Sequence, residues 1–108
     1  MVTVLGSDML TIKEAPKFLA PSPECAMGTD YEGHGFFEAS SIRKFDGKYY
    51  FVYSSEVMHE LCYATSDYPD RDFKYGGVIV SNCDIGISTY KKAEEPAAYG
   101  ANNHGGLC

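Results

Sequence analysis

Two β-rich segments flank an Asp-Gly dipeptide in residues 36–55, which read FFEASSIRKFDGKYYFVYSS. Asp46-Gly47 is a favoured pair for a two-residue hairpin turn, because both central residues of that turn need positive φ. We therefore predict a hairpin with strands at Glu38–Lys44 and Lys48–Ser55. The second strand is apolar at successive positions instead of alternating, a pattern typical of a strand covered on both faces.

Two further β-rich segments follow, Leu61–Thr65 and Phe73–Val80. Between them, residues 66–72 are polar and contain Pro69, which predicts an exposed loop. Gly77–Val80 is again continuously apolar, so we expect this strand to be covered on both sides as well. The four segments predict an all-β fold built on an antiparallel four-stranded meander. A sheet of this size cannot cover both its faces, and in β-propellers the neighbouring blades do so.

The segments on either side of the meander carry weaker patterns. Residues 1–33 are punctuated by Pro16, Pro21, Pro23 and Gly28, and we interpret them as an irregular connection with room for one strand. The chain becomes loop-like again after Val80. The fold expected from the sequence is therefore a meander with irregular flanking segments.

Composition excludes several classes of partner. The 108 residues are 44% hydrophobic and 22% charged, as in folded globular proteins, and the net charge is −6. Binding to a phosphate backbone needs clustered Lys and Arg, so we expect no nucleic-acid partner. No apolar run approaches the ~20 residues of a membrane span, and the N-terminus lacks a signal-peptide pattern. We expect no membrane partner, a neutral or polar ligand and, from the absent signal peptide, a cytoplasmic location.

The four cysteines, Cys25, Cys62, Cys83 and Cys108, lie far apart in the chain. No Cys-x-x-Cys pair is present, which argues against a zinc site. We interpret them as scattered thiols, with a disulfide admitted only in an oxidising compartment. The dipeptide His59-Glu60 falls at the turn between the second and third strands, where it could face the interior or solvent, and we expect it to face solvent.

Glu38 is the first candidate for chemistry. It follows two aromatic residues, Phe36 and Phe37, and precedes small ones at the start of the first strand. A carboxyl group beside aromatic surface loses solvation, which favours its protonated form and suits a general acid. The alternative is a strand-edge glutamate that points into water, the common situation for this residue type.

An ordered series of motifs resembles the third blade of glycoside hydrolase family 43, whose members are five-bladed β-propeller glycosidases of the arabinofuranosidase and β-xylosidase type. The series covers about two thirds of the chain, and its members follow one another in the family's order. They are FFEASSIRK (36–44), GKYYFVYSS (47–55), ELCYATS (60–66), FKYGGVIVSN (73–82) and NNHG (102–105).

The resemblance implies an inverting hydrolase of arabinosides or xylosides in plant polysaccharides, with Glu38 as the catalytic general acid. The family's base, an Asp on the first blade, and its second Asp on the next blade have no counterpart here. Asp8, Asp30 and Glu32 match no family motif and receive no role; we expect Asp8 in a surface turn and the other two in the loop before Glu38. An inverting site needs both acid and base, so we expect the chain to be inactive alone.

Further site residues follow from the same resemblance. His34, Phe36 and Phe37 are expected to line the sugar subsite, where aromatic faces pack against a sugar ring; the alternative is packing within the loop. His104 resembles the histidine that family members direct into the central funnel, where it helps to hold a calcium ion or a water; the alternative is an exposed histidine near the chain end. The resemblance requires no cofactor and admits a structural calcium ion in the complete propeller.

The expected organisation is one partial domain over residues 1–108. Residues 1–35 connect from a preceding blade, 36–82 form the blade-like meander, and 83–108 lead toward a next blade. The expected partners are an arabinose- or xylose-containing glycan and the missing blades of a parent protein. A different class of function stays open beside the truncated glycosidase: a non-catalytic carbohydrate-binding or assembly module built on the same blade.

Overall fold

A computed structural model describes residues 1–56 and 60–81 of the chain. These residues form six strands and one short helix in two sheets. The elements are β1 (Val2–Leu5), β2 (Ile12–Lys17), α1 (Pro23–Ala26), β3 (Phe36–Phe45), β4 (Lys48–Ser55), β5 (Leu61–Ser66) and β6 (Lys74–Val80).

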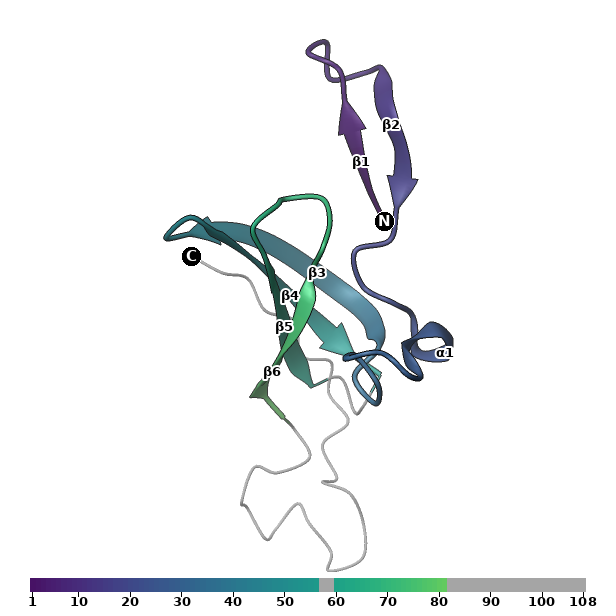
Figure 1. Cartoon of the computed structure of the whole chain (residues 1–108), viewed down its shortest axis with the longest axis vertical. Helices are drawn as coiled ribbons and strands as arrows, with labels where there is room; N and C mark the ends of the chain where they lie inside the picture. Colours follow the sequence, from purple (N-terminus) through teal and green to yellow (C-terminus); the bar gives the residue numbers. More distant parts are fainter. Residues whose placement is uncertain (57–59, 82–108) are drawn as a thin grey trace, which may run out of the picture.

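The predicted meander is confirmed. Strands β3, β4, β5 and β6 lie side by side in that order, and each pairs antiparallel with the next (Figure 1). The first strand begins two residues earlier than predicted, at Phe36, and the last begins one residue later, at Lys74. Strand ends shift by this amount because pairing with a neighbour, not local composition, decides where a ladder stops.

The tight turn at Asp46-Gly47 is also confirmed. Asp46 has φ 46° and Gly47 has φ 78°, the two positive values that a type I′ turn requires. Phe45 pairs with Lys48 across the turn, so the hairpin loop consists of Asp46 and Gly47 alone. The turn therefore fixes the register of β3 against β4 at this end of the sheet.

One face of the sheet is covered by the segment that precedes β3. Tyr31 of that segment donates a hydrogen bond from its hydroxyl to the carbonyl of Phe73, at 2.8 Å. Burial raises the pKa of Tyr31, so the hydroxyl stays protonated as the donor. The buried core that results contains Ala20, Ala26, Tyr31, Phe51, Tyr53, Cys62, Ala64 and Phe73.

The N-terminal segment departs from the sequence expectation. It contains a two-stranded hairpin, β1 with β2, where an irregular connection with room for one strand was predicted (Figure 1). Asp8 lies in the connecting turn and accepts hydrogen bonds from the backbone N–H of Leu10 and Thr11, at 3.0 and 2.9 Å. The Thr11 hydroxyl also donates a hydrogen bond to Asp8. This bond is the largest cause of the lowered pKa of Asp8, about 2, and the two backbone bonds add to it. The residues of β2 are almost all exposed, so no alternating pattern marks the strand in the sequence.

Among the described residues, β4 is covered on both faces as predicted, whereas β6 is only partly covered. Phe51 to Ser55 are all buried, so β4 is covered on both faces. In β6, by contrast, Val78, Ile79 and Val80 are 42%, 47% and 50% exposed. The physical reason is position: β6 is an edge strand, whereas β4 lies between two neighbours.

Over residues 1–56 and 60–81, no helix has the length and apolar character needed to cross a membrane.

The polar loop around Pro69 connects β5 to β6, as predicted. Its conformation is held by Ser66, whose hydroxyl donates to the carbonyl of Arg71 at 2.6 Å and accepts from the N–H of Tyr68 at 3.0 Å.

Candidate active site

Strand β3 is irregular around Glu38. From Phe36 to Ser41 it advances by five residues, while the paired stretch of β4, from Ser55 to Val52, advances by three. Register shifts fall on either side of Glu38, between Phe36 and Glu38 and between Glu38 and Ser41. Glu38 therefore sits between two β-bulges, a feature that often re-aims side chains next to active sites.

The bulges decide which face of the sheet Glu38 occupies. Ile42 pairs with Phe51 and contacts the core, so a regular strand would place Glu38, four residues earlier, on the same core face. The extra residue between Glu38 and Ser41 inverts this alternation and pairs Glu38 with Ser54, on the opposite face from Phe51. The second bulge returns Phe36 to the core face. Glu38 is half-buried and directed away from the aromatic core.

Ala39 carries the backbone strain of this arrangement. Its φ is 57°, in the left-handed region that non-glycine residues rarely adopt. Such a conformation costs of order 1–3 kcal/mol and persists where the surrounding structure enforces it, often at functional sites. The strain lies next to the residue that the sequence singled out for catalysis.

His34 lies four residues before Glu38 and is fixed by three contacts. Its ring stacks on Tyr75, with ring centroids 5.0 Å apart and an interplanar angle of 12°. Its carbonyl accepts a hydrogen bond from the Tyr53 hydroxyl at 2.7 Å, and its Nδ1 contacts Glu60 Oε1. The imidazole is thus held in one orientation at the edge of the core.

The expectation that Glu60 faces solvent is wrong. Glu60 is 5% exposed, and its Oε1 also accepts hydrogen bonds from Ser55 Oγ at 3.1 Å and from Cys62 Sγ at 3.7 Å. A buried carboxylate needs such partners to offset its lost hydration. The sequence carried one signal that could have revealed this group: Glu60 directly precedes the strand that begins at Leu61 and lies two residues from Cys62, a spacing that places both side chains on one face where the backbone is extended.

The two aromatic residues before Glu38 have different surroundings. Phe36 packs in the core, with its ring centroid 6.0 Å from that of Phe51 and 5.9 Å from that of Tyr53. Phe37 is 51% exposed and stands beside Glu38 in the chain. Of the two phenylalanines predicted to contact the sugar, Phe37 therefore presents the larger accessible aromatic surface.

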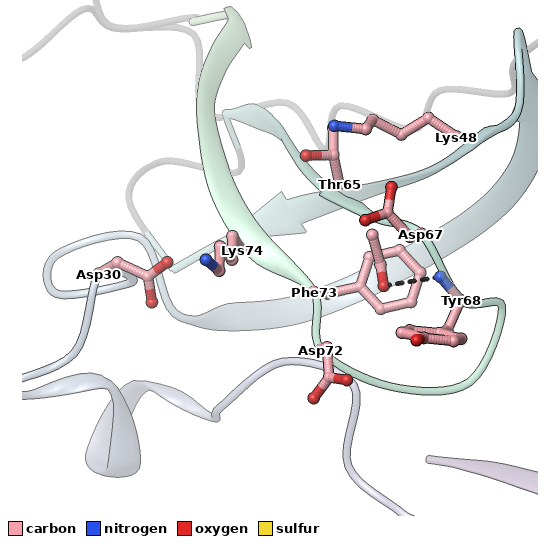
Figure 2. Close-up of a pocket in the computed structure, with 9 residues that line it drawn as sticks. Asp30, Lys48, Thr65, Asp67, Tyr68, Asp72, Phe73 and Lys74 are labelled. Atoms are coloured by element: carbon pink, nitrogen blue, oxygen red, sulfur yellow. Dashed lines mark hydrogen bonds between the residues drawn. The ribbon is translucent and has the colours of Figure 1, made fainter.

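A hollow formed by described residues lies at the other end of the meander (Figure 2). It has a volume of about 840 Å³ and is bordered by charges of both signs, including Asp30, Asp67, Lys48 and Lys74. Lys48 begins β4, whereas Ser54, the partner of Glu38, lies six residues further along the strand, which is about 20 Å at 3.3 Å per residue. This hollow does not include Glu38.

Other predicted positions fall outside the described residues. His104, the expected metal-site histidine, and His59 lie there, as do Cys83 and Cys108. Among the described residues, Cys25 is an exposed free thiol and Cys62 a buried one. Burial, followed by the nearby charge of Glu60, raises the pKa of Cys62 to about 11.

Comparison with known proteins relates the chain to glycosidases. No protein-family model matches it. A xylosidase/arabinosidase of Thermoclostridium stercorarium is 62% identical over 107 residues, which is 99% of this chain and 23% of the relative. A β-xylosidase of Xylanibacter ruminicola is 55% identical over 95 residues, covering 87% of this chain and 30% of the relative.

Solved structures agree with this relationship. One neighbour is a family 43 β-xylosidase/α-arabinofuranosidase from a compost metagenome, solved with xylotriose in a calcium-free form. It is 36% identical, with a TM-score of 0.56 over 71% of this chain and 24% of the neighbour. The chain thus spans about a quarter of the length of the relatives it matches.

Proposed function

Because the chain corresponds to one section of a glycoside hydrolase family 43 protein, we propose that it supplies the general acid, Glu38, for hydrolysis of xylosides or arabinosides. The observation that carries the proposal is the pair of bulges on β3, which turns Glu38 away from the aromatic core. A glutamate with no role beyond the strand surface would need neither bulge nor the strained Ala39 in the second bulge.

In the proposed reaction, the Glu38 carboxyl donates its proton to the glycosidic oxygen as the bond to the anomeric carbon breaks. A water attacks that carbon from the opposite face of the sugar, and a second carboxylate takes the water's proton. Inversion requires the two carboxyl groups to be about 6.5–9.5 Å apart, so that the water fits between base and sugar. We propose that the base belongs to a part of the protein outside this section, and that the 108 residues alone do not turn over substrate.

We propose a xylose- or arabinose-containing glycan as the substrate. Phe37, next to the acid and half exposed, offers an aromatic face on which a sugar ring can pack. His34 precedes both residues and has its ring held by Tyr75, which suits a polar contact to a sugar hydroxyl. The family neighbour solved with xylotriose supports this class of ligand.

A chimera tests the role of Glu38. The 107 matching residues of the Thermoclostridium relative are replaced by those of this chain, which the 62% identity should accommodate. In an active chimera, Glu38→Gln should lower kcat on xylo-oligosaccharides by about 10²–10⁴-fold, because the leaving oxygen loses its proton donor. Aryl glycosides with good leaving groups should lose much less.

Glu32→Gln is the matched control, since Glu32 is exposed and only accepts a hydrogen bond from the Gly28 N–H at 3.0 Å. It should retain full activity. Oligosaccharide hydrolysis by the Glu38→Gln chimera within twofold of the parent chimera would rule out the acid assignment. Hydrolysis by the 108-residue chain alone would refute its inactivity, and sugar binding that ignores Glu38→Gln would favour a binding module instead.

A further inference from the structure

We propose that His34, Glu60 and Cys62 form a binding site for a borderline divalent transition-metal ion, best matched by zinc. The His34 Nδ1, a carboxylate oxygen of Glu60 and the Cys62 Sγ all lie within 4.8 Å of one another. Two of the three residues are buried, at 5% exposure for Glu60 and 0% for Cys62. The site shares His34 with the proposed sugar subsite but does not use Glu38, the proposed proton donor.

The fold brings these donors together from two segments. Glu60 and Cys62 stand two residues apart at the start of β5 and so point to the same face. His34 reaches that face from the loop before β3, 26 residues earlier in the sequence. Spacing along the chain therefore gives no metal motif, although the donor atoms converge in space.

Two of the three donors, His34 and Glu60, are held in place by separate contacts. Stacking on Tyr75 sets the plane of the His34 ring, and the Tyr53 hydroxyl holds the His34 carbonyl at 2.7 Å. Glu60 is held through its main chain, where its carbonyl accepts the Ser55 N–H at 2.9 Å. Little rearrangement is needed for a metal to bind, which favours affinity.

Hydrogen-bond donors crowd one oxygen of this cluster. His34 Nδ1, Ser55 Oγ and Cys62 Sγ all contact Glu60 Oε1. These three contacts bring the donor atoms around one position next to the carboxylate oxygen, where a single cation could take the place of the protons. A metal ion at that point would displace the thiol proton to solvent, would bind the Nδ1 of a neutral His34 whose proton is then on Nε2, and would leave Ser55 as a support for the carboxylate.

The chemistry of the donors selects the metal. Imidazole nitrogen and thiolate sulfur suit zinc and similar ions, whereas calcium requires six to eight oxygen ligands. Glu60 and a Cys62 thiolate together balance a charge of +2, so the bound site is neutral. Burial raises the pKa of the Cys62 thiol, and a bound divalent ion reverses this by removing its proton outright. Three protein ligands leave a fourth position, which water can enter past the 32% exposed His34 side chain.

Cobalt provides the direct test, because a cobalt–thiolate bond gives a charge-transfer absorption band. In the full chain with Cys25→Ser, Cys83→Ser and Cys108→Ser, Cys62 is the only remaining thiol. Titration with Co²⁺ should give this band with one ion per chain, and Zn²⁺ should abolish it. His34→Asn or Cys62→Ser should weaken binding by more than the roughly 10–100-fold that changes around a metal's ligands produce.

Glu32→Gln, which changes an exposed carboxylate outside the three proposed ligands, serves as the matched control and should leave the band unchanged. A second measurement uses the unaltered chain, so that it does not depend on variants that fold: Zn²⁺ should slow alkylation of Cys62 at least tenfold while leaving that of exposed Cys25 unchanged. Absence of the band, its survival in folded His34→Asn, or equal alkylation of Cys62 with and without Zn²⁺ would overturn the proposal.

Discussion

At the scale of single residues, the backbone of Ala39 and the side chain of Glu60 are the features that composition and spacing hide. A left-handed bulge residue is usually marked by glycine, yet the segment after Glu38 reads Ala-Ser-Ser. The sequence around Glu60 gives only one indication of burial, the two-residue spacing from Cys62, because its partner His34 lies 26 residues earlier. The sequence did single out Glu38 and His34, because a motif of adjacent residues carries them.

The strain at Ala39 predicts an unusual response to substitution. Ala39→Val should lower the free energy of unfolding by about 1–3 kcal/mol, since a β-branched residue fits poorly at φ 57°. Ala39→Gly should be tolerated, because relief of strain offsets the roughly 0.5–1 kcal/mol entropic cost of glycine. Urea denaturation of the chain measures both changes.

Ala15→Val is the matched control, because Ala15 is exposed on β2 and does not have positive φ. Valine favours strands, so this substitution should leave stability within about 0.5 kcal/mol of the parent. Equal effects of valine at positions 39 and 15 would contradict the assignment of strain to Ala39.

At the scale of elements, the sequence predicts strands well where nearby residues, such as a tight turn and the apolar run after it, determine them. The β3–β4 hairpin follows from Asp46-Gly47 and the long apolar run after it, both local signals. The β1–β2 hairpin escaped prediction because β2 is exposed on both faces and so lacks alternation. Whether β6 is covered depends on what packs against this edge strand, and the sequence of the strand itself does not say what does.

The hairpin turn gives a prediction at this scale. Gly47 has φ 78° and no atom within 4 Å of the position that a Cβ would occupy, so conformation alone limits substitution there. Gly47→Val should destabilise the chain by about 1–3 kcal/mol, and Gly47→Asn by clearly less, since asparagine tolerates the left-handed region. Thermal unfolding followed by circular dichroism measures the difference. Similar losses for the two variants would show that the turn does not set the stability of the hairpin.

At the scale of the whole molecule, apolar side chains remain exposed at the margins of the described structure. The exposed residues of the outer strand β6 are Val78, Ile79 and Val80. On the N-terminal hairpin, Leu10 is 86% exposed and Ile12 is 61% exposed. Exposed apolar edge strands are sites of association. A chain that matches a quarter of its relatives' length has this surface available for the contacts that the rest of such a protein would make.

This surface predicts self-association of the isolated chain. Val80→Lys should weaken that association roughly tenfold, because a lysine on an edge strand opposes pairing with another strand. Sedimentation velocity over a range of concentrations measures the effect. Ser7→Lys adds the same charge at an exposed turn residue between β1 and β2 and should change little. Equal effects of the two lysines would mean that net charge, not the β6 edge, controls association.

The paired bulges of β3 also constrain how this stretch can evolve. Each bulge is one extra residue, so deleting Phe37, or either Ala39 or Ser40, would remove a bulge and leave Phe36, Glu38 and Ile42 on their present faces. Deleting one codon in the regularly paired stretch from Ser41 to Phe45 would instead shift the register by one residue and exchange the faces of the side chains beyond it. Single-codon insertions and deletions that preserve the core should therefore fall within residues 37–40, and alignments of related sequences should show gaps there and not in the stretch that follows.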